Sequence, residues 1–241
     1  MNKKPWRDNS IPMPRPRKVY ARKAETYDQE MINKFGEHYF KVIRKIVELV
    51  RPRSEDVVLD MGAGTGAVSF ALAPYVKKVI AVDISEQMLN EAKRKAEDSN
   101  IGNIDFVVGD FLHPNVEGTV DVIVSNIALH HLTDEEKEKA VKIMAEKLND
   151  GGRLVLGDVI IFFDTTQKQA DEVLNVIQEY MGRGKSRAIK ELREVFSKKH
   201  PARFEDLERM IIGNGLKIEK VEKIFSIIGV IKAVKTASSQ G

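Results

Sequence analysis

Residues 57–66 have the sequence Val-Val-Leu-Asp-Met-Gly-Ala-Gly-Thr-Gly, and this stretch decides the fold of the chain. Its aliphatic beginning is typical of a buried parallel strand. The glycines at alternate positions predict a tight turn where the backbone approaches a ligand closely, because a Cβ atom there would collide with it. The apolar residues from Ala67 to Leu72 predict a buried helix. Strand, glycine turn and helix together predict the first unit of a doubly wound α/β nucleotide-binding fold.

The composition favours one α/β domain with an insertion over two full domains. The 241 residues are 42% hydrophobic and 31% charged, which is enough apolar material for one large core. The chain has no cysteine, which excludes disulfides and cysteine metal sites and fits a cytoplasmic location. No apolar run is long enough to span a bilayer, and no secretory signal is expected. The composition leaves the oligomeric state open.

Positive charge is concentrated at the start of the chain. Residues 1–23 contain eight lysine and arginine residues against one aspartate, whereas the whole chain has a net charge of only +3. Residues 1–18 also contain four of the eight prolines and are expected to form an extended basic arm. Such an arm is able to contact RNA or an anionic substrate, although a solvated terminal extension is the simpler interpretation.

The rest of the chain alternates between predicted strands and helices. Two N-terminal helices are expected within residues 19–51, and Gly151-Gly152 is expected to turn the chain into the fifth strand. Residues 164–200 interrupt the alternation with two amphipathic patterns, which predict a helical cap. The strands expected after the first are 79–83, 104–109, 120–124, 153–161 and the antiparallel pair 216–224 and 227–234. The helices expected between these strands begin near Glu86, Asp134 and Phe204.

Acidic residues end three successive predicted strands. Asp60 ends the first strand and Asp83 the second, where a carboxylate can accept hydrogen bonds from both hydroxyls of a ribose. Asp110 follows the third strand, where it suits an exocyclic adenine amine, and Phe111 can pack on the ring. Because the carboxyl ends of parallel strands share one sheet edge, these acids predict a cationic ligand that contains adenosine. The competing interpretation makes the acids helix caps or surface residues, and Phe111 and Met88 plain core.

Four motifs together resemble the class I S-adenosylmethionine-dependent methyltransferases. They are Val-Leu-Asp-Met-Gly-Ala-Gly-Thr-Gly at 58–66, Ala-Val-Asp-Ile-Ser-Glu-Gln-Met-Leu at 81–89, Gly-Asp-Phe at 109–111 and Ser-Asn-Ile-Ala-Leu-His-His-Leu at 125–132. The nearest branch contains ubiquinone/menaquinone-biosynthesis enzymes and many small-molecule methyltransferases. The resemblance covers residues 53–157 closely and the last helix and strand pair more loosely. It implies a single domain with a Rossmann-like, seven-stranded, mostly parallel sheet of order 3-2-1-4-5-7-6 and helices on both faces.

The resemblance implies S-adenosylmethionine as the cofactor. Asp60 and the glycine turn would surround its methionine part, Asp83 would hold the ribose, and Asp110 would hold the adenine. Tyr20 and Tyr27 lie where related enzymes fold an N-terminal helix over the cofactor. The implied cofactor contacts are, in chain order, Tyr20, Tyr27, Asp60, Gly62, Ala63, Gly64, Gly66, Asp83, Ile84, Met88, Asp110, Phe111, Asn126 and Ile127.

The adjacent residues His130 and His131 lie where an acceptor would meet the transferred methyl group. Either is therefore a candidate general base, although packing of at least one of them is the simpler interpretation. With no acidic partner nearby they make a poor metal site, and no metal is expected. The expected reaction is methyl transfer to a small-molecule acceptor, which releases S-adenosylhomocysteine.

Three alternatives stay open. A nicotinamide-dependent oxidoreductase would also use Asp83, but the glycines follow G-x-G-x-G rather than G-x-G-x-x-G. An RNA methyltransferase would use the basic arm, but the sequence contains no recognised RNA-binding module and no Asn/Asp-Pro-Pro-Tyr/Phe motif after the fourth strand. A cofactor-binding protein that acts by interaction alone would not need the intact set of cofactor residues.

Overall fold

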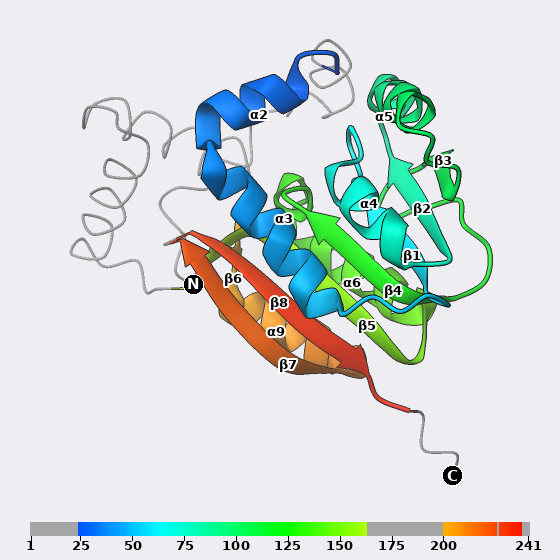
Figure 1. Ribbon diagram of the computed structural model, residues 1–241. Coiled ribbons are helices and arrows are strands. Elements are labelled where there is room, and N and C mark those ends of the chain that lie inside the picture. The colour runs from blue at the N-terminus through cyan, green and yellow to red at the C-terminus, as the bar shows by residue number, and fades with distance from the viewer. Residues whose placement is uncertain (1–23, 163–199, 226, 238–241) are drawn as a thin grey trace, which may run out of the picture.

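The computed structural model describes residues 24–162, 200–225 and 227–237. The predicted basic arm, Tyr20 and nearly all of the predicted cap lie outside these residues. Figure 1 shows one twisted sheet with helices on both faces. Its elements are α2 (Tyr27–Phe35), α3 (Glu37–Val50), β1 (Val57–Met61), α4 (Ala67–Leu72), β2 (Lys78–Asp83), α5 (Glu86–Asp98), β3 (Ile104–Val108), β4 (Val120–Asn126), α6 (Asp134–Lys147), β5 (Leu148–Ile161), β6 (Ala202–Arg203), α9 (Phe204–Gly213), β7 (Leu216–Phe225) and β8 (Ile228–Lys235), with short 3-10 turns at Ala73–Tyr75 and Leu129–His131.

The strand order confirms the predicted fold. The sheet has the order β3-β2-β1-β4-β5-β8-β7, and the two-residue strand β6 pairs with β5 beside this path. Strands β1 to β5 run parallel to one another, whereas β8 lies antiparallel between β5 and β7. The short β6 raises the numbers of the last two strands by one, so the observed order is the predicted 3-2-1-4-5-7-6 with one small strand added.

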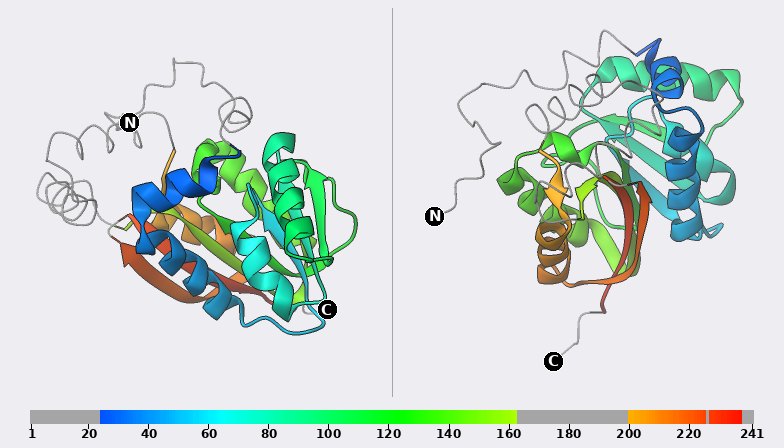
Figure 2. Two further views of the ribbon diagram at one scale, coloured as in Figure 1. Left: turned by 45° about the horizontal axis from the view of Figure 1, so that its top comes forward. Right: turned by 90° about the vertical axis from the view of Figure 1, so that its left-hand side faces the viewer.

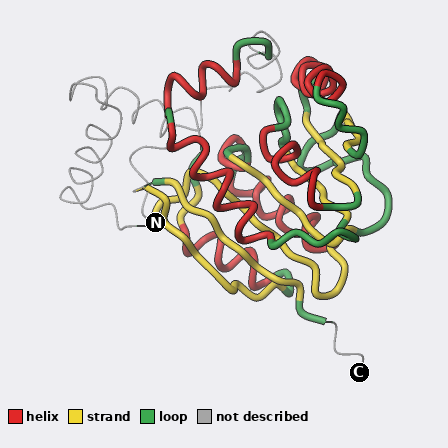
Figure 3. Tube along the Cα trace, viewed as in Figure 1, coloured by secondary structure: helices red, strands yellow, loops and turns green. Residues whose placement is uncertain are grey.

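Two hydrophobic layers, one on each face of the sheet, hold the helices. Successive residues of β1 point to opposite faces, so Val58 packs in the layer of α3 and α4 while Leu59 packs in the layer of α6 and α9. Figure 2 shows the helices on the two faces of the sheet from two further sides, and Figure 3 separates the helices from the sheet by colour. Both side chains are fully buried, and each such burial contributes about 1.5–3 kcal/mol. The alternation explains why the central strands are apolar on both faces.

A buried ion pair lies at the amino-terminal end of the parallel strands. Arg153 of β5 contacts Asp56 at 2.5 Å, and the side chains are only 7% and 6% exposed. Asp56 also accepts a hydrogen bond from the backbone N–H of Arg53 at 2.7 Å. Arg153 donates a second hydrogen bond to the carbonyl of Arg51, where α3 has just ended. The pair therefore ties the α3–β1 connection to β5 at the end of the sheet opposite the carboxyl ends.

One predicted boundary is wrong. Gly151 and Gly152 lie inside β5, which begins at Leu148, instead of turning the chain into it. The register between β4 and β5 shifts between Val120 and Val122, and Gly151 takes a φ of 74° there, so the glycines form an irregularity within the strand. Helices α2 and α3 both lie within the range 19–51 in which two N-terminal helices were expected. In the described ranges, no helix combines the length and the apolar character needed to cross a lipid bilayer.

Candidate functional site

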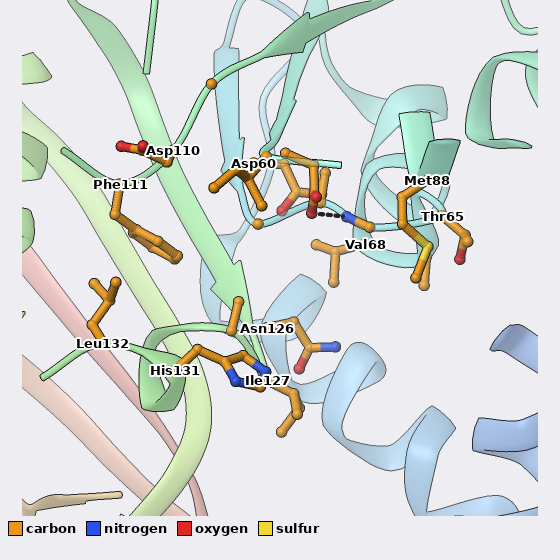
Figure 4. A pocket seen from close by; sticks show the side chains of 18 of the residues that line it. Asp60, Thr65, Val68, Met88, Asp110, Phe111, Asn126, Ile127, His131 and Leu132 are labelled. Atoms are coloured by element: carbon orange, nitrogen blue, oxygen red, sulfur yellow. Dashed lines mark hydrogen bonds between the residues drawn. The ribbon is translucent and has the colours of Figure 1, made fainter. Parts of the chain in front are cut away.

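A cavity of about 510 Å³ lies where the parallel strands end at their carboxyl termini. Its wall contains residues from the ends of β1, β2 and β4, from the segment after β3, and from α2 and α3. Its volume is in the range that holds a small-molecule ligand, and its place is the one where open parallel sheets bind ligands. Figure 4 shows this cavity from close by. The predicted cofactor residues that line it are Tyr27, Asp60, Gly62, Ala63, Gly64, Asp83, Ile84, Met88, Asp110, Phe111, Asn126 and Ile127.

The glycine turn combines two different requirements. Gly62 has a φ of 75°, and a Cβ atom there would lie 2.5 Å from the Cβ of Ala128. Gly64 has a φ of 56°, but a Cβ atom there would meet no protein atom within 4 Å. The sequence predicted that a Cβ atom in this turn would collide with a ligand. At Gly62 the Cβ atom would instead collide with the protein's own segment after β4. Gly66 does not line the cavity, and it serves as the N-cap of α4.

Asp60 is a buried acid at the cavity wall. Its side chain is 1% exposed, and its Oδ2 accepts a hydrogen bond from the Ser69 hydroxyl at 2.6 Å. Burial raises the pKa of Asp60 to about 7; the hydrogen bond from Ser69 lowers the pKa and the charge of Asp83 raises it, both less strongly. Because a nearby cation would favour the ionised form, Asp60 is suited to a positively charged group in the cavity. Asp60 is neither a helix cap nor a surface residue.

Asp83 connects the end of β2 to the glycine turn. Its Oδ2 accepts a hydrogen bond from the Gly64 N–H and its Oδ1 accepts one from the Ser85 N–H, both at 2.8 Å. Burial raises the pKa of Asp83, although the hydrogen bonds from Ser85 and Gly64 oppose this rise. Each carboxylate oxygen has a second lone pair, so Asp83 retains acceptor capacity for a ligand hydroxyl.

The segment after β3 supplies Asp110 and Phe111. Oδ1 of Asp110 accepts hydrogen bonds from the N–H groups of Leu112 and His113, both at 2.8 Å, so this oxygen caps a turn. Phe111 belongs to the hydrophobic layer of α6 and α9 and also lines the cavity, where Figure 4 shows its ring. Both residues therefore have a structural role and also line the cavity.

Helix α2 adds a further side to the cavity. Tyr27 and Met31 line it, and Asp28 bridges two other elements. Oδ1 of Asp28 accepts a hydrogen bond from the Thr65 hydroxyl at 2.5 Å, and Oδ2 contacts Nζ of Lys95 in α5 at 2.6 Å. The bridge attaches α2 directly to the glycine turn. Nothing in the sequence pairs Asp28 with either partner, because the contacts span 37 and 67 residues.

The two histidines after β4 have different surroundings. His131 lines the cavity, and Figure 4 shows its ring beside Ile127. His130 is 1% exposed, and its Nδ1 lies 2.5 Å from Oδ1 of Asp158 in β5. The expectation that the histidines have no acidic partner nearby was wrong, because the fold brings Asp158 to them from 28 residues away. Across the described ranges, no three His, Cys, Asp or Glu side chains converge as a metal site would require.

Several lining residues were not identified from the sequence as site residues. Tyr39 fits the core spacing of its helix, and the structure shows it both buried and at the cavity wall. Burial raises the pKa of Tyr39, and the charges of Asp28 and Asp60 raise it further. Glu136 forms the predicted capping box with Thr133 and lies at the wall as well. The other lining residues not identified are Met31, Thr65, Ala67, Val68, Gly109, Leu112, His113, Ala128 and Leu132.

Comparisons with known proteins agree with this geometry. Residues 58–152 match the family described as "Methyltransferase domain". An uncharacterized methyltransferase of Oceanobacillus iheyensis is 35% identical over 157 residues, which cover 62% of this chain and 68% of that protein. The fold resembles N-methyltransferase NodS from Bradyrhizobium japonicum in complex with S-adenosyl-L-homocysteine, with a TM-score of 0.68, 14% identity and coverage of 93% of this chain and 100% of that one. It also resembles magnesium protoporphyrin IX methyltransferase from Synechocystis with bound S-adenosylmethionine, with a TM-score of 0.64, 18% identity and coverage of 95% and 100%.

Proposed function

Because this chain belongs to the class I S-adenosylmethionine-dependent methyltransferases, we propose that its reaction is methyl transfer to a small-molecule acceptor bound in the cavity at the carboxyl ends of β1, β2 and β4. The observation that carries the proposal is the combination, in one cavity wall, of the buried Asp60 and the partly buried Asp83 with the imidazole of His131. The acids suit the cofactor, and the imidazole suits an acceptor that must lose a proton.

The residues of the cavity fit the cofactor. Asp83 has lone pairs left for the ribose hydroxyls, and Asp60 is a buried acid whose ionised form a cationic group would stabilise. Oδ1 of Asn126 is a buried acceptor without a hydrogen-bond partner among the described residues. When bound, S-adenosylmethionine supplies a methyl group on a positively charged sulfur, which is a good leaving group. The remaining task of the protein is to position the acceptor and exclude water.

His131 is the residue proposed to take a proton from the acceptor. It is the member of the histidine pair that lines the cavity, whereas His130 is buried against Asp158. A neutral imidazole accepts a proton near neutral pH, which matches the work of a general base. His131 would be needed only for an acceptor whose attacking group carries a proton that must leave.

The acceptor is proposed to be a small molecule, and the branch with ubiquinone/menaquinone-biosynthesis enzymes remains the proposed branch. The Ser-Asn-Ile-Ala-Leu-His-His-Leu motif at 125–132 supports the branch. Structural neighbours named as acting on small molecules, such as magnesium protoporphyrin IX methyltransferase, support the acceptor class. We also propose one domain over residues 1–241 with a cap at 164–200, and a cytoplasmic location, which the lack of cysteine supports.

Calorimetry and a methyl-transfer screen test the proposal. The wild-type protein is expected to bind S-adenosylmethionine and S-adenosylhomocysteine, and no binding of either would overturn it. Radiolabelled cofactor is then offered with fractionated metabolite pools and, separately, with RNA, using Asp83→Ala as the inactive control. Label in a metabolite fraction that is absent from the control supports the proposal. Label in RNA, lost when residues 1–18 are deleted, would favour the RNA methyltransferase instead.

A further inference from the structure

The buried pair His130 and Asp158 has no assigned part in methyl transfer. Both side chains are almost completely buried, with 1% and 3% exposure. Placing a histidine and an aspartate out of water has a cost that only close mutual contact offsets. The pair lies directly beside the cavity, because the next residue, His131, lines it. Its position raises the question of what the contact does for the site.

The carboxylate of Asp158 receives three donors. Oδ1 accepts from the Val159 N–H at 2.6 Å and lies 2.5 Å from Nδ1 of His130, while Oδ2 accepts from the His130 N–H at 3.0 Å. Burial alone would raise the pKa of Asp158, but the interactions with His130, the hydrogen bond from the Val159 N–H and the charge of His131 together hold the pKa below its usual value. Since an ionised carboxylate only accepts hydrogen bonds, Nδ1 of His130 carries the proton. The tautomer and orientation of His130 are therefore fixed.

The same contacts fix the turn that carries His131. Asp158 holds both the backbone and the ring of His130, and the carbonyl of His130 accepts from the His200 N–H at 2.8 Å. The Ile127 N–H donates to the Gly157 carbonyl at 2.7 Å, so β5 holds the segment at a second point. The rings of His130 and His131 lie 4.2 Å apart between centroids, with planes tilted by 41°. The fixed His130 ring thus forms a wall against which the His131 ring rests.

We propose that Asp158 and His130 are positioning residues that hold the imidazole of His131 in its cavity-facing orientation. The inference rests on the proposed function, in which His131 accepts a proton from the acceptor. Asp158→Asn is the discriminating change, because the three donors lie on both carboxylate oxygens. An asparagine offers one acceptor oxygen and one NH₂ group, so at least one of the donors then faces another donor.

The test follows the ring resonances of His131 in two-bond proton–nitrogen NMR spectra of the full chain with S-adenosylhomocysteine. The five histidines are assigned by single substitutions. Asp56→Asn is the matched control, because it removes the charge of another buried pair at the opposite end of the sheet. In Asp158→Asn the His131 resonances are expected to shift and broaden, and in Asp56→Asn to stay as in the wild type. Unchanged His131 resonances in Asp158→Asn would overturn the proposal.

A second variant covers the case in which Asp158→Asn does not fold. His130→Asn keeps an amide donor for Asp158 but removes the ring that supports His131, so the same shift and broadening are expected. With the acceptor found by the screen, kcat is expected to fall about 100-fold in either variant, while KM for S-adenosylmethionine stays within about twofold. A fall in kcat no larger than in Asp56→Asn would contradict the proposal. If the wild type binds no cofactor, the proposed function is wrong. The positioning proposal can then still be tested, because the His131 spectra can be recorded without ligand.

Discussion

The N–H of Gly64 donates to Oδ2 of Asp83 at 2.8 Å, which fastens the glycine turn after β1 to the carboxyl end of β2. Oδ1 of the same carboxylate accepts from the Ser85 N–H and so also fixes the start of α5. One side chain thus sets the relative position of two segments that line the cavity. Asp83 holds the turn, and we propose that its remaining lone pairs accept hydrogen bonds from a ligand.

Asp83→Ala is expected to weaken binding of S-adenosylhomocysteine about 10- to 100-fold. The change removes the acceptor for the Gly64 N–H and the proposed acceptor for the ribose, and hydrogen bonds to a charged group contribute about 1.5–3 kcal/mol each. Isothermal calorimetry at pH 8 measures the dissociation constant. Asp105→Ala is the matched control, because Asp105 lies on β3 in an exposed ion pair with Lys78. Equal affinities of the two variants would remove Asp83 from the binding site.

Asp60→Asn is expected to make the ligand-free protein more stable above pH 7 than the wild type. The pKa of Asp60 is about 7 in the folded protein and near 4 in the unfolded chain. Below pH 4 the carboxyl is protonated in both states, whereas between pH 4 and 7 only the folded state keeps the proton. Rising pH therefore removes stability from the wild type, on the order of 4 kcal/mol once pH passes 7, and asparagine lacks this loss.

Urea unfolding at pH 4.5, 6 and 8 measures this effect. The difference in unfolding free energy between Asp60→Asn and the wild type is expected to grow with pH across this window. Asp105→Asn, at an exposed ion pair, controls for the loss of one carboxyl. A difference that stays constant with pH would show that Asp60 is ionised throughout. The ammonium of S-adenosylhomocysteine should also release a proton from Asp60 at pH 6.5, which calorimetry in two buffers of different ionisation enthalpy detects.

The order of the elements and many of the residues at the cavity wall follow from local sequence. The aliphatic run into the glycine turn defines β1, and Thr133 with Glu136 forms the capping box that their spacing predicts. These features depend on residues close together in the chain. Local propensity and hydrophobic spacing therefore suffice to find them.

The parts that the sequence did not reveal depend on contacts between distant residues. His130 meets Asp158 only because β4 and β5 are paired, and Asp28 meets Thr65 only because α2 returns to the glycine turn. The helical spacing of Tyr39 predicts that its side chain is buried, but it does not predict that the side chain also lines a cavity. No local pattern contains such information. The residue that each of these side chains contacts can be named only when the fold is known.

Asp28→Ala is expected to release α2 from the cavity. Asp28 contacts Thr65 at 2.5 Å and Lys95 at 2.6 Å, and these contacts link α2 to the glycine turn and to α5. Tyr27 and Met31 would then leave the cavity wall more often, so dissociation of S-adenosylhomocysteine should become about 10-fold faster. Stopped-flow displacement measures the rate, and hydrogen exchange of residues 27–35 reports on the helix.

Asp98→Ala is the control for Asp28→Ala. Asp98 forms an ion pair with Arg94 at 2.7 Å on the exposed side of α5 and does not line the cavity. This variant should leave both the dissociation rate and the exchange of α2 unchanged. If Asp28→Ala also leaves them unchanged, the Asp28 bridge does not hold the helix over the ligand.

Gly62→Ala is expected to destabilise the protein more than Gly118→Ala. The two glycines have similar φ angles, 75° and 69°, so an alanine in the left-handed region costs about 1–2 kcal/mol at either position. Only at Gly62 would the new Cβ also lie 2.5 Å from the Cβ of Ala128, while at Gly118 it meets nothing within 4 Å. Urea unfolding of both variants isolates that contact. Adding Ala128→Gly to Gly62→Ala removes the opposing atom, so stability should return to the level of Gly118→Ala. If Ala128→Gly gives no recovery, the close approach of the turn to the segment after β4 is not what requires glycine at position 62.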